Sequence, residues 1–341
     1  MFKKAIIVKS KTRLEQITEQ YNTVSQAAFS LKRQRENLEV QDNFLSEETK
    51  KNVSSHRAKK KKDKGSGEFS DFSEEHQQYQ NVLEAVQNKV SKHLKIKVLE
   101  NSFLPSFIFS EEDLIIVIGH DGLVANTAKY AKNLPIIAIN PDPTRFDGYL
   151  LPFHLNNFEQ TFLQVLQDRA RFKMVTMAEV LLNDGQRLLA FNDFFIGTVS
   201  HTSARYLITF GEENETHSSS GIIVSTGAGA TGWLSSLFNM TNGMNQAFGQ
   251  NKAAYICPKP NIQMESAQLV FVVREPFLSK TSQISVVAGI ITPQKELVVE
   301  SLMSKTGIIF SDGLENDKLK FNSGTVARIG IAKEKAKLVV L

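Results

Sequence analysis

The hydrophobic pattern of this chain changes near residue 150, and this change limits the folds that the chain can adopt. Before it, segments of helical periodicity alternate with four short apolar runs, at 5–8, 95–99, 114–119 and 135–140. After residue 172, strand-like runs follow one another with turn residues between them. Strands that alternate with helices indicate a parallel sheet, whereas strands joined by turns indicate antiparallel pairing. We therefore predict an α/β N-terminal domain with a parallel, Rossmann-like sheet and a β-rich, sandwich-like C-terminal domain.

The same pattern suggests where the domains and their elements lie. We expect the α/β domain at residues 1–150 and the β-rich domain at residues 151–325. Asn183-Asp184-Gly185 predicts a hairpin between runs at 174–182 and 187–195, because Asp-Gly suits a tight turn. Helices are expected at 12–44, 74–93, 122–132 and 157–170.

Residues 45–72 differ from the rest of the chain in composition. They are polar and charged, and they include the lysine run 59–62 and a Gly-Ser-Gly sequence at 65–67. Such a segment cannot bury enough apolar surface to order itself, so we predict a mobile insertion. The alternative is that the lysine run contacts an anion or a nucleic acid.

Composition excludes several classes of protein. The chain has 341 residues, a net charge of +4 and one cysteine, so an intrachain disulfide is impossible and a nucleic-acid partner is not indicated. The apolar run at 5–8 is too short for a signal peptide, and other runs are far below the roughly 20 residues that span a bilayer. We expect a cytoplasmic protein without a membrane partner. No P-loop motif, no Gly-x-Gly-x-x-Gly after the first strand and no zinc-type Cys/His cluster is present.

The stretch from residue 221 to residue 236 is the first candidate for ligand binding. Gly221–Val224 reads as a short buried strand, Ser225–Trp233 consists mostly of Gly, Ala and Thr, and Leu234 and Leu237 follow at helical spacing. A strand, a small-residue turn and a helix bring backbone N–H groups close to a phosphate or a sugar. The alternative is a tight packing turn that binds nothing.

A second candidate follows the apolar run that begins at Leu114. The run ends in Gly119, and Asp121 lies just beyond it, before Gly122. Ligands of open parallel sheets bind at the carboxyl ends of the strands, where an acid can meet a hydroxyl or a phosphate-bound metal. The alternative is a surface turn, because Asp-Gly is a common turn pair.

Together these segments resemble the NAD kinase family, within the superfamily shared with diacylglycerol kinases. The Gly-Gly-Asp-Gly-Thr motif of that family reads Gly119-His120-Asp121-Gly122-Leu123 here, and its Asn-Glu pair at a strand start reads Asn192-Asp193. Its Val-Ser-Thr-Pro-Thr-Gly-Ser-Thr-Ala-Tyr motif is in register with residues 224–233. The resemblance runs from about residue 95 to the end, with weaker matches at Ile139-Asn140, Gly148-Tyr149 and Asp312-Gly313.

The resemblance implies ATP-dependent phosphorylation of NAD at the adenosine ribose 2′-hydroxyl, which gives NADP. Asp121 is the implied general base, and Gly119, His120 and Gly122 are the implied phosphate and ATP contacts. Mg²⁺ would be held mostly by the nucleotide phosphates. The partners would then be ATP and NAD. We also expect a homo-oligomer, and a tail at 326–341 that returns to the first domain.

The implied NAD contacts come from both domains. A carboxylate accepts two vicinal hydroxyl donors well, which suits Asp193 to a ribose. Trp233 is the implied lining of the adenine pocket, and its alternative role is a core or domain-interface aromatic. The full implied set is Tyr149, Asn192, Asp193, Thr226, Gly229, Ala230, Thr231, Trp233 and Ser236.

The chain also departs from the family motifs. His120 adds bulk and a titratable ring where phosphates are expected, and Leu123 lacks the motif hydroxyl. Gly227 replaces a proline, Ala230 a serine, and Asp193 is one methylene shorter than the family Glu. Two alternatives therefore stay open: a nucleotide-binding sensor without turnover, and a superfamily kinase that acts on a lipid or a sugar alcohol.

Overall fold

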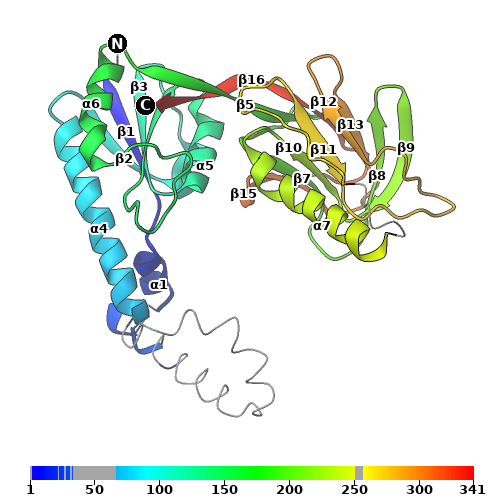
Figure 1. Ribbon diagram of the computed structural model, residues 1–341, viewed down its shortest axis with the longest axis horizontal. Coiled ribbons are helices and arrows are strands. Elements are labelled where there is room, and N and C mark those ends of the chain that lie inside the picture. Colours follow the sequence, from blue (N-terminus) through cyan, green and yellow to red (C-terminus); the bar gives the residue numbers. More distant parts are fainter. Residues whose placement is uncertain (1, 22, 27, 31–32, 34–66, 250–255) are drawn as a thin grey trace.

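The computed structural model describes residues 2–249 and 256–341, apart from residues 22, 27, 31–32 and 34–66. Figure 1 shows that the molecule has two halves. Two long strands connect them: β5 (Arg171–Leu182) and β16 (Val326–Val340). One half is an α/β layer structure with a parallel sheet, and the other consists mainly of antiparallel strands. The predicted fold class is confirmed.

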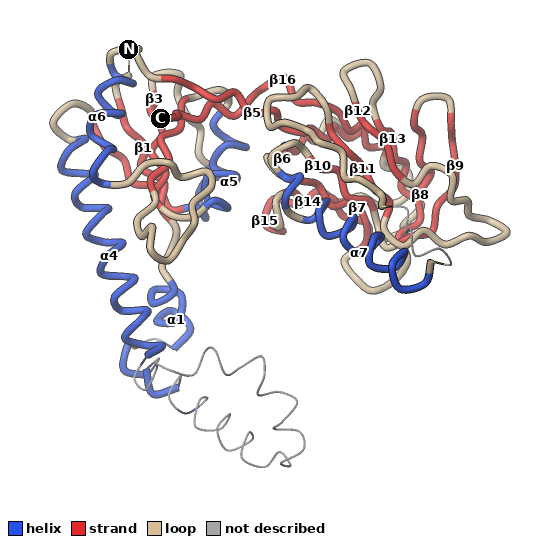
Figure 2. Tube along the Cα trace, in the orientation of Figure 1, coloured by secondary structure: helices blue, strands red, loops and turns tan. Residues whose placement is uncertain are grey.

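The first half is built on four parallel strands in the order β2-β1-β3-β4. The central strands are buried along almost their whole length, as expected for a sheet covered on both faces. Helix α5 (Asp121–Ala131) packs on one face, and helices α4 (Gly67–Val90) and α6 (Leu155–Leu166) pack on the other (Figure 2). The strands are β1 (Lys4–Lys9), β2 (Lys95–Glu100), β3 (Asp113–Ile118) and β4 (Pro135–Ile139).

The boundary expected at residue 150 falls too early. Helix α6 buries Phe158, Phe162 and Val165 in the same core as Val82 and Val86 of α4. Its apolar stripe therefore covers the parallel sheet, and the first half extends to residue 166.

The segment expected to be a mobile insertion ends earlier than residue 72. Helix α4 begins at Gly67, whereas the sequence predicted a helix only from residue 74. The Asp71 carboxylate lies 2.6 Å from the Arg145 guanidinium, and Phe72 lies under Arg13. These contacts attach the first turns of α4 to the rest of the first half. The lysine run 59–62 and most of the expected insertion lie outside the described residues. Helix α1 (Arg13–Tyr21) is the described beginning of the helix predicted at 12–44.

The second half is a sandwich of two sheets. A six-stranded antiparallel sheet, in the order β12-β11-β10-β7-β14-β15, packs against the antiparallel part of the sheet that contains β16, and their facing apolar residues form one core. Helix α7 (Trp233–Phe248) covers the outer face of the six-stranded sheet. The six strands are β7 (Asp193–Thr198), β10 (Ile222–Ser225), β11 (Leu269–Val273), β12 (Ala288–Ile291), β14 (Gly307–Ser311) and β15 (Leu314–Lys320).

Strand β16 connects the two halves within one ten-stranded sheet. Its end pairs with β4 in parallel, at Lys337–Pro135 and Leu338–Ile136, and it pairs with β5 along most of its length. The other antiparallel members are β6 (Arg187–Ala190), β8 (Ala204–Phe210), β9 (Glu213–Ser219) and β13 (Leu297–Ser301). Among the described helices, none has the length and apolar character needed to cross a bilayer.

Candidate functional site

The loop after β3 places Asp121 at the carboxyl edge of the parallel sheet. Asp121 is the first residue of α5, where a carboxylate is stabilised by the positive end of the helix dipole. Its Oδ1 accepts a hydrogen bond from the backbone N–H of Leu150 at 2.7 Å. Asp121 therefore has a defined orientation even though it lies at a loop–helix junction.

Two neighbours of Asp121 explain the small residues of this loop. A Cβ on Gly119 would lie 2.9 Å from Cδ2 of Leu123, and one on Gly122 would lie 3.2 Å from the His120 ring. Leu123 is 2% exposed and packs in the core beneath the loop. Leu123, which stands where the family motif has threonine, thus packs against Gly119 from the core side of the loop.

The loop between β4 and α6 is folded by two residues that matched the family weakly. The Asn140 side chain donates to the Phe146 carbonyl at 2.9 Å and accepts from the Asp142 N–H at 3.0 Å. Gly148 has φ +61°, and a Cβ there would lie 2.5 Å from Asn140 Nδ2. Asn140 and Gly148 therefore shape the segment that presents Tyr149 and the Leu150 N–H.

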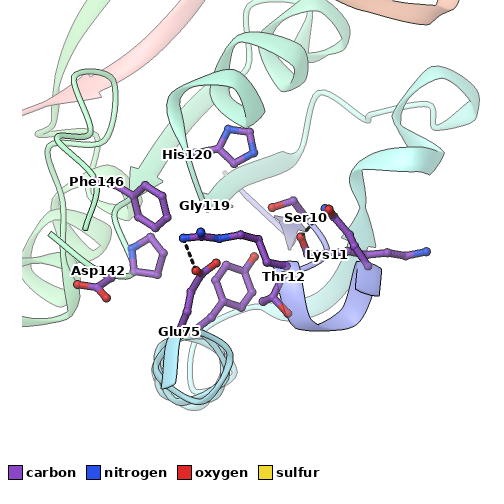
Figure 3. Close-up of a pocket in the computed structure, with 12 residues that line it drawn as sticks. Ser10, Lys11, Thr12, Glu75, Gly119, His120, Asp142 and Phe146 are labelled. Carbon is purple, nitrogen blue, oxygen red and sulfur yellow. Dashed lines mark hydrogen bonds and ion pairs between the residues drawn. The ribbon is translucent and has the colours of Figure 1, made fainter. Parts of the chain in front are cut away.

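A pocket of about 190 Å³ opens where β1, β3 and β4 end (Figure 3). His120 and Gly119 form one side of it, and Glu75 of α4 lies opposite. The remaining lining residues are Ser10, Lys11, Thr12, Arg13, Gln16, Tyr79, Pro141, Asp142 and Phe146.

The segment after β1 was missed by the sequence analysis. Arg13 pairs with Glu75 at 2.6 Å, and the Thr12 hydroxyl lies 2.8 Å from His76 Nδ1. The available signal was the pair of cations, Lys11 and Arg13, directly after a buried strand. Cations at the carboxyl edge of a parallel sheet are suited to an anionic ligand.

His120 contributes a ring to this pocket but little positive charge. Partial burial lowers the pKa of the imidazole, and the neighbouring Asp121 carboxylate opposes that shift without reversing it. The ring is thus mainly neutral at pH 7.

Asp193 lies at the start of β7 beside a second acid, Asp312, which is half-buried. Asp193 is 9% exposed, and burial together with the Asp312 carboxylate raises its pKa to about 7. The Asp312 carboxylate accepts the backbone N–H groups of Phe191, Asn192 and Asp193 at 3.1, 2.6 and 3.3 Å. Burial raises the pKa of Asp312, whereas Lys129 and these N–H donors act in the opposite direction.

Asp312 is a second residue whose role the sequence analysis did not assign. It occupies a tight turn with Gly313, and both have positive φ, +55° and +71°. Asp-Gly is a favoured pair for this turn between antiparallel strands. The weak Asp312-Gly313 match therefore marked a residue that orders the Asn192-Asp193 pair.

The turn after β10 has the predicted order of strand, small residues and helix. The Thr226 hydroxyl is fully buried; it donates to the Phe191 carbonyl at 2.6 Å and accepts from the N–H groups of Ala228 and Gly229. A direct contact of Thr226 with a ligand, as the resemblance implied, does not fit this arrangement. The hydroxyl instead holds the turn against the Asn192-Asp193 segment.

Glycine is required in this turn by close backbone approach. A Cβ on Gly229 would lie 2.2 Å from the Asn192 carbonyl oxygen, and one on Gly227 would lie 2.2 Å from the Gln263 carbonyl oxygen. Gly227, which stands where the family has proline, therefore occupies a position that is too crowded for any side chain.

Trp233 belongs to an aromatic cluster. Its ring stacks on Phe195 with 5.8 Å between centroids and 7° between planes, and the Arg274 guanidinium lies 5.5 Å from its ring centre. Trp233 thus packs, partly buried, on the outer face of the six-stranded sheet. Ser236 lies one turn further and is exposed, with its hydroxyl 3.4 Å from the Gly232 carbonyl.

A smaller pocket of about 170 Å³ joins the turn to the first half. Tyr149 lines it together with Ala230, Thr231 and the cations Lys173 and Lys259. Tyr149 is 77% exposed, and Lys259 donates to the Ala230 carbonyl at 2.8 Å. Lys173 and Lys259 were not singled out from the sequence.

The loop 148–151 links the three motifs. Leu150 binds Asp121, Tyr149 lines a pocket with the turn, and the turn binds back to Asn192 through the Thr226 N–H at 2.9 Å. Residues from three distant parts of the sequence therefore meet at one edge of the molecule. A helix N-terminus and two pockets whose linings include lysine or arginine suit a phosphorylated nucleotide.

Comparisons with known proteins find NAD kinases among the proteins similar to this chain. A NAD kinase of Saccharolobus islandicus (strain M.14.25) is 26% identical over 162 residues, which cover 48% of this chain and 59% of that protein. A NAD kinase of Lachnospira eligens is 25% identical over 155 residues, 43% of this chain and 48% of that protein. The matched stretch thus spans only about half to three-fifths of these relatives, and no family model matches the chain.

Solved structures show the same fold at lower identity. Yeast NADH kinase in complex with NADH has a TM-score of 0.54 and 14% identity, over 77% of this chain and 80% of that one. The NAD kinase of Archaeoglobus fulgidus in complex with ATP has a TM-score of 0.52 and 14% identity, over 76% and 89% of the two chains.

Proposed function

We propose that this chain, which is related to the NAD kinase family in sequence and in fold, transfers a phosphoryl group from ATP to the adenosine ribose 2′-hydroxyl of NAD and so makes NADP. One observation supports this proposal most strongly. The loop 148–151 contacts Asp121 and lines a pocket with the small-residue turn, and that turn is hydrogen-bonded to Asn192.

Asp121 acts as the general base in this proposal. Its Oδ1 is held by the Leu150 N–H, and the carboxylate takes the proton of the ribose 2′-hydroxyl as the oxygen attacks the terminal phosphorus of ATP. The bond from that phosphorus to the bridging oxygen breaks, and ADP leaves. Phosphoryl transfer depends mainly on position and charge, so a fixed base at a helix N-terminus suits it.

The pocket beside His120 receives the triphosphate. The N–H groups at the start of α5 supply positive potential there. Lys11 and Arg13 also line this pocket, where each is ion-paired with a glutamate of the chain. Mg²⁺ supplies charge neutralisation on the phosphates when it is bound with ATP. Among the described residues, no group of three acidic, His or Cys side chains is arranged to hold a metal ion.

The NAD side of the site is formed by the second half. Asp193 and Asn192 receive ribose hydroxyls or the nicotinamide end, and the backbone of residues 229–231 receives the adenosine. Tyr149 covers this region from the first half. Incubation of the purified protein with NAD, ATP and Mg²⁺, followed by an assay for NADP, tests the proposal, and absence of NADP contradicts it.

His120 favours a second candidate function, a nucleotide-binding sensor without turnover. A neutral ring lines the pocket where the family motif has glycine, so it fills space without attracting phosphate. If the parent binds NAD but forms no NADP, His120→Gly should open the pocket and produce turnover.

A further inference from the structure

Helix α5 carries functional groups at both of its ends. Asp121 begins it, and Lys129 and Tyr130 lie in its last turn, about 12 Å further along at 1.5 Å per residue. The groups at its end contact Asp317 of the second half, whereas Asp121 contacts the loop between β4 and α6 within the first half. A single rigid helix therefore links the general base to a second set of contacts.

The contact at the end of α5 is a buried ion pair. The Lys129 ammonium lies 2.8 Å from Asp317 Oδ2, and the two side chains are 2% and 12% exposed. The Tyr130 hydroxyl donates to the same oxygen at 2.5 Å. A buried charge that loses its partner is strongly unfavourable, so this pair holds the two segments together.

Asp317 belongs to the hairpin that orders the NAD side of the site. It lies in β15, which pairs with β14, and the turn between these strands contains Asp312. The Asp312 carboxylate binds the three backbone N–H groups of residues 191–193. Lys129 also acts on the Asp312 charge, since it favours the ionised carboxylate.

We propose that the Lys129–Asp317 ion pair is a positioning device that sets Asn192 and Asp193 relative to Asp121. The pair fixes the β14–β15 hairpin to the helix that carries the base, and the hairpin fixes the start of β7 through Asp312. Lys129 is a positioning residue and touches no substrate. The expected effect of Lys129 on catalysis rests on the proposed function. The expected effect of Lys129 on the relative position of the two halves rests only on the described contacts.

The test compares Lys129→Met and Asp317→Asn with the parent in the full chain. Lys89→Met is the control for loss of a lysine ion pair, because Lys89 forms a more exposed pair of 2.7 Å with Glu159 between α4 and α6, entirely within the first half. We expect the first two variants to raise the Kd and KM for NAD by about tenfold or more, while the KM for ATP stays within about twofold. Lys129→Arg should restore most of the NAD affinity.

A change of stability alone does not reproduce this result. Loss of folded protein lowers kcat but leaves the KM for NAD unchanged, whereas displaced Asn192 and Asp193 raise it. If Lys129→Met does not fold, Tyr130→Phe keeps the ion pair, removes one hydrogen bond to Asp317 and should give a smaller shift in the same direction. Unchanged NAD affinity in every folded variant would overturn the inference.

A second readout needs no activity and separates this inference from the proposed function. Spin labels are attached to cysteines introduced by Ser91→Cys and Lys280→Cys in a Cys257→Ser background. Pulsed electron paramagnetic resonance then measures the distance between the two halves. We expect a broader distribution in Lys129→Met than in the parent or in Lys89→Met. A parent that makes no NADP but shows this difference contradicts only the proposed function, and an unchanged distribution with unchanged NAD binding contradicts the positioning role.

Discussion

At the scale of single residues, the site depends on where each carboxylate finds its partners. Asp121 accepts a backbone N–H at a helix N-terminus, while Asp193 is buried next to another acid, Asp312. The surroundings of Asp121 therefore orient its carboxylate, whereas the surroundings of Asp193 disfavour ionisation of its carboxyl group. Their proposed roles, proton acceptor and ribose ligand, differ accordingly.

Asp121→Asn should lower NADP formation by about 10²–10⁴-fold, the usual range for the loss of a general base. The amide keeps the shape of the carboxylate and can still accept the Leu150 N–H, so the loop should stay in place. NAD and ATP affinities, measured by calorimetry, should remain near those of the parent. NADP formation near the parent rate would falsify the catalytic role of Asp121.

NAD affinity should rise between pH 6 and pH 8 as Asp193 ionises, since its pKa is raised to about 7 and the carboxylate is the better acceptor for ribose hydroxyls. Asp193→Asn should remove most of this dependence. Titrations of NAD across the pH range measure it, and a parent that shows the same affinity at all pH values rules Asp193 out as the ligand.

The raised pKa of Asp193 also has a consequence for folding, with the opposite sign. In the unfolded chain the carboxyl ionises near its ordinary value of about 3.9. Its contribution to stability is therefore fully present below that pH and is lost as the pH rises through about 7. Relative to Asp193→Asn, the parent should lose stability over this window in urea unfolding, and a constant difference contradicts the assignment.

At the scale of secondary-structure elements, the turn between β10 and α7 depends on close backbone packing. Gly229 approaches the Asn192 carbonyl, and the Thr226 hydroxyl bridges the turn to Phe191. The turn and the Asn192-Asp193 strand start are thus a single packed unit. A change in one should displace the other.

Gly229→Ala should destabilise the protein and weaken NAD binding, because the new Cβ would lie 2.2 Å from a carbonyl oxygen. Gly243→Ala is the control: a Cβ there meets nothing within 4 Å, and the position lies inside α7. Alanine in a helix interior should stabilise by about 0.5–1 kcal/mol relative to glycine. Thermal melting and calorimetric NAD titration measure both, and equal behaviour of the two variants contradicts the packing argument.

At the scale of the whole molecule, the two halves share a sheet. Strand β16 pairs with β4 of the parallel sheet and with β5 and β13 of the antiparallel part. A continuous sheet resists independent movement of its two ends, so the ion pair of Lys129 acts on halves that are already joined.

Two deletions test how far α4 contributes to the first half. Removal of residues 45–72 takes away the Asp71–Arg145 ion pair and the Phe72–Arg13 contact, whereas removal of residues 45–66 leaves both. The longer deletion should have the lower Tm, by several degrees for a loss of about 1–2 kcal/mol. Identical melting curves would show that the first turns of α4 do not stabilise the fold.

The sequence by itself determined the parts of this protein that depend on local pattern. Short apolar runs specified the parallel strands, and the Asn183-Asp184-Gly185 turn specified the pairing of β5 with β6. The motifs at 119–122, 192–193 and 224–233 indicated the candidate site, because strand ends and small-residue turns can be read from neighbouring residues.

Only the tertiary structure decided how these parts meet. The loop that joins Tyr149 and Leu150 to two motifs, the half-buried partner Asp312 and the Lys129–Asp317 pair all join residues distant in sequence. Their contacts depend on the order of strands in two sheets, and local propensity carries no information about that order. The same reason explains why α6 was assigned to the wrong half and why Thr226 was read as a ligand contact when its hydroxyl holds the turn.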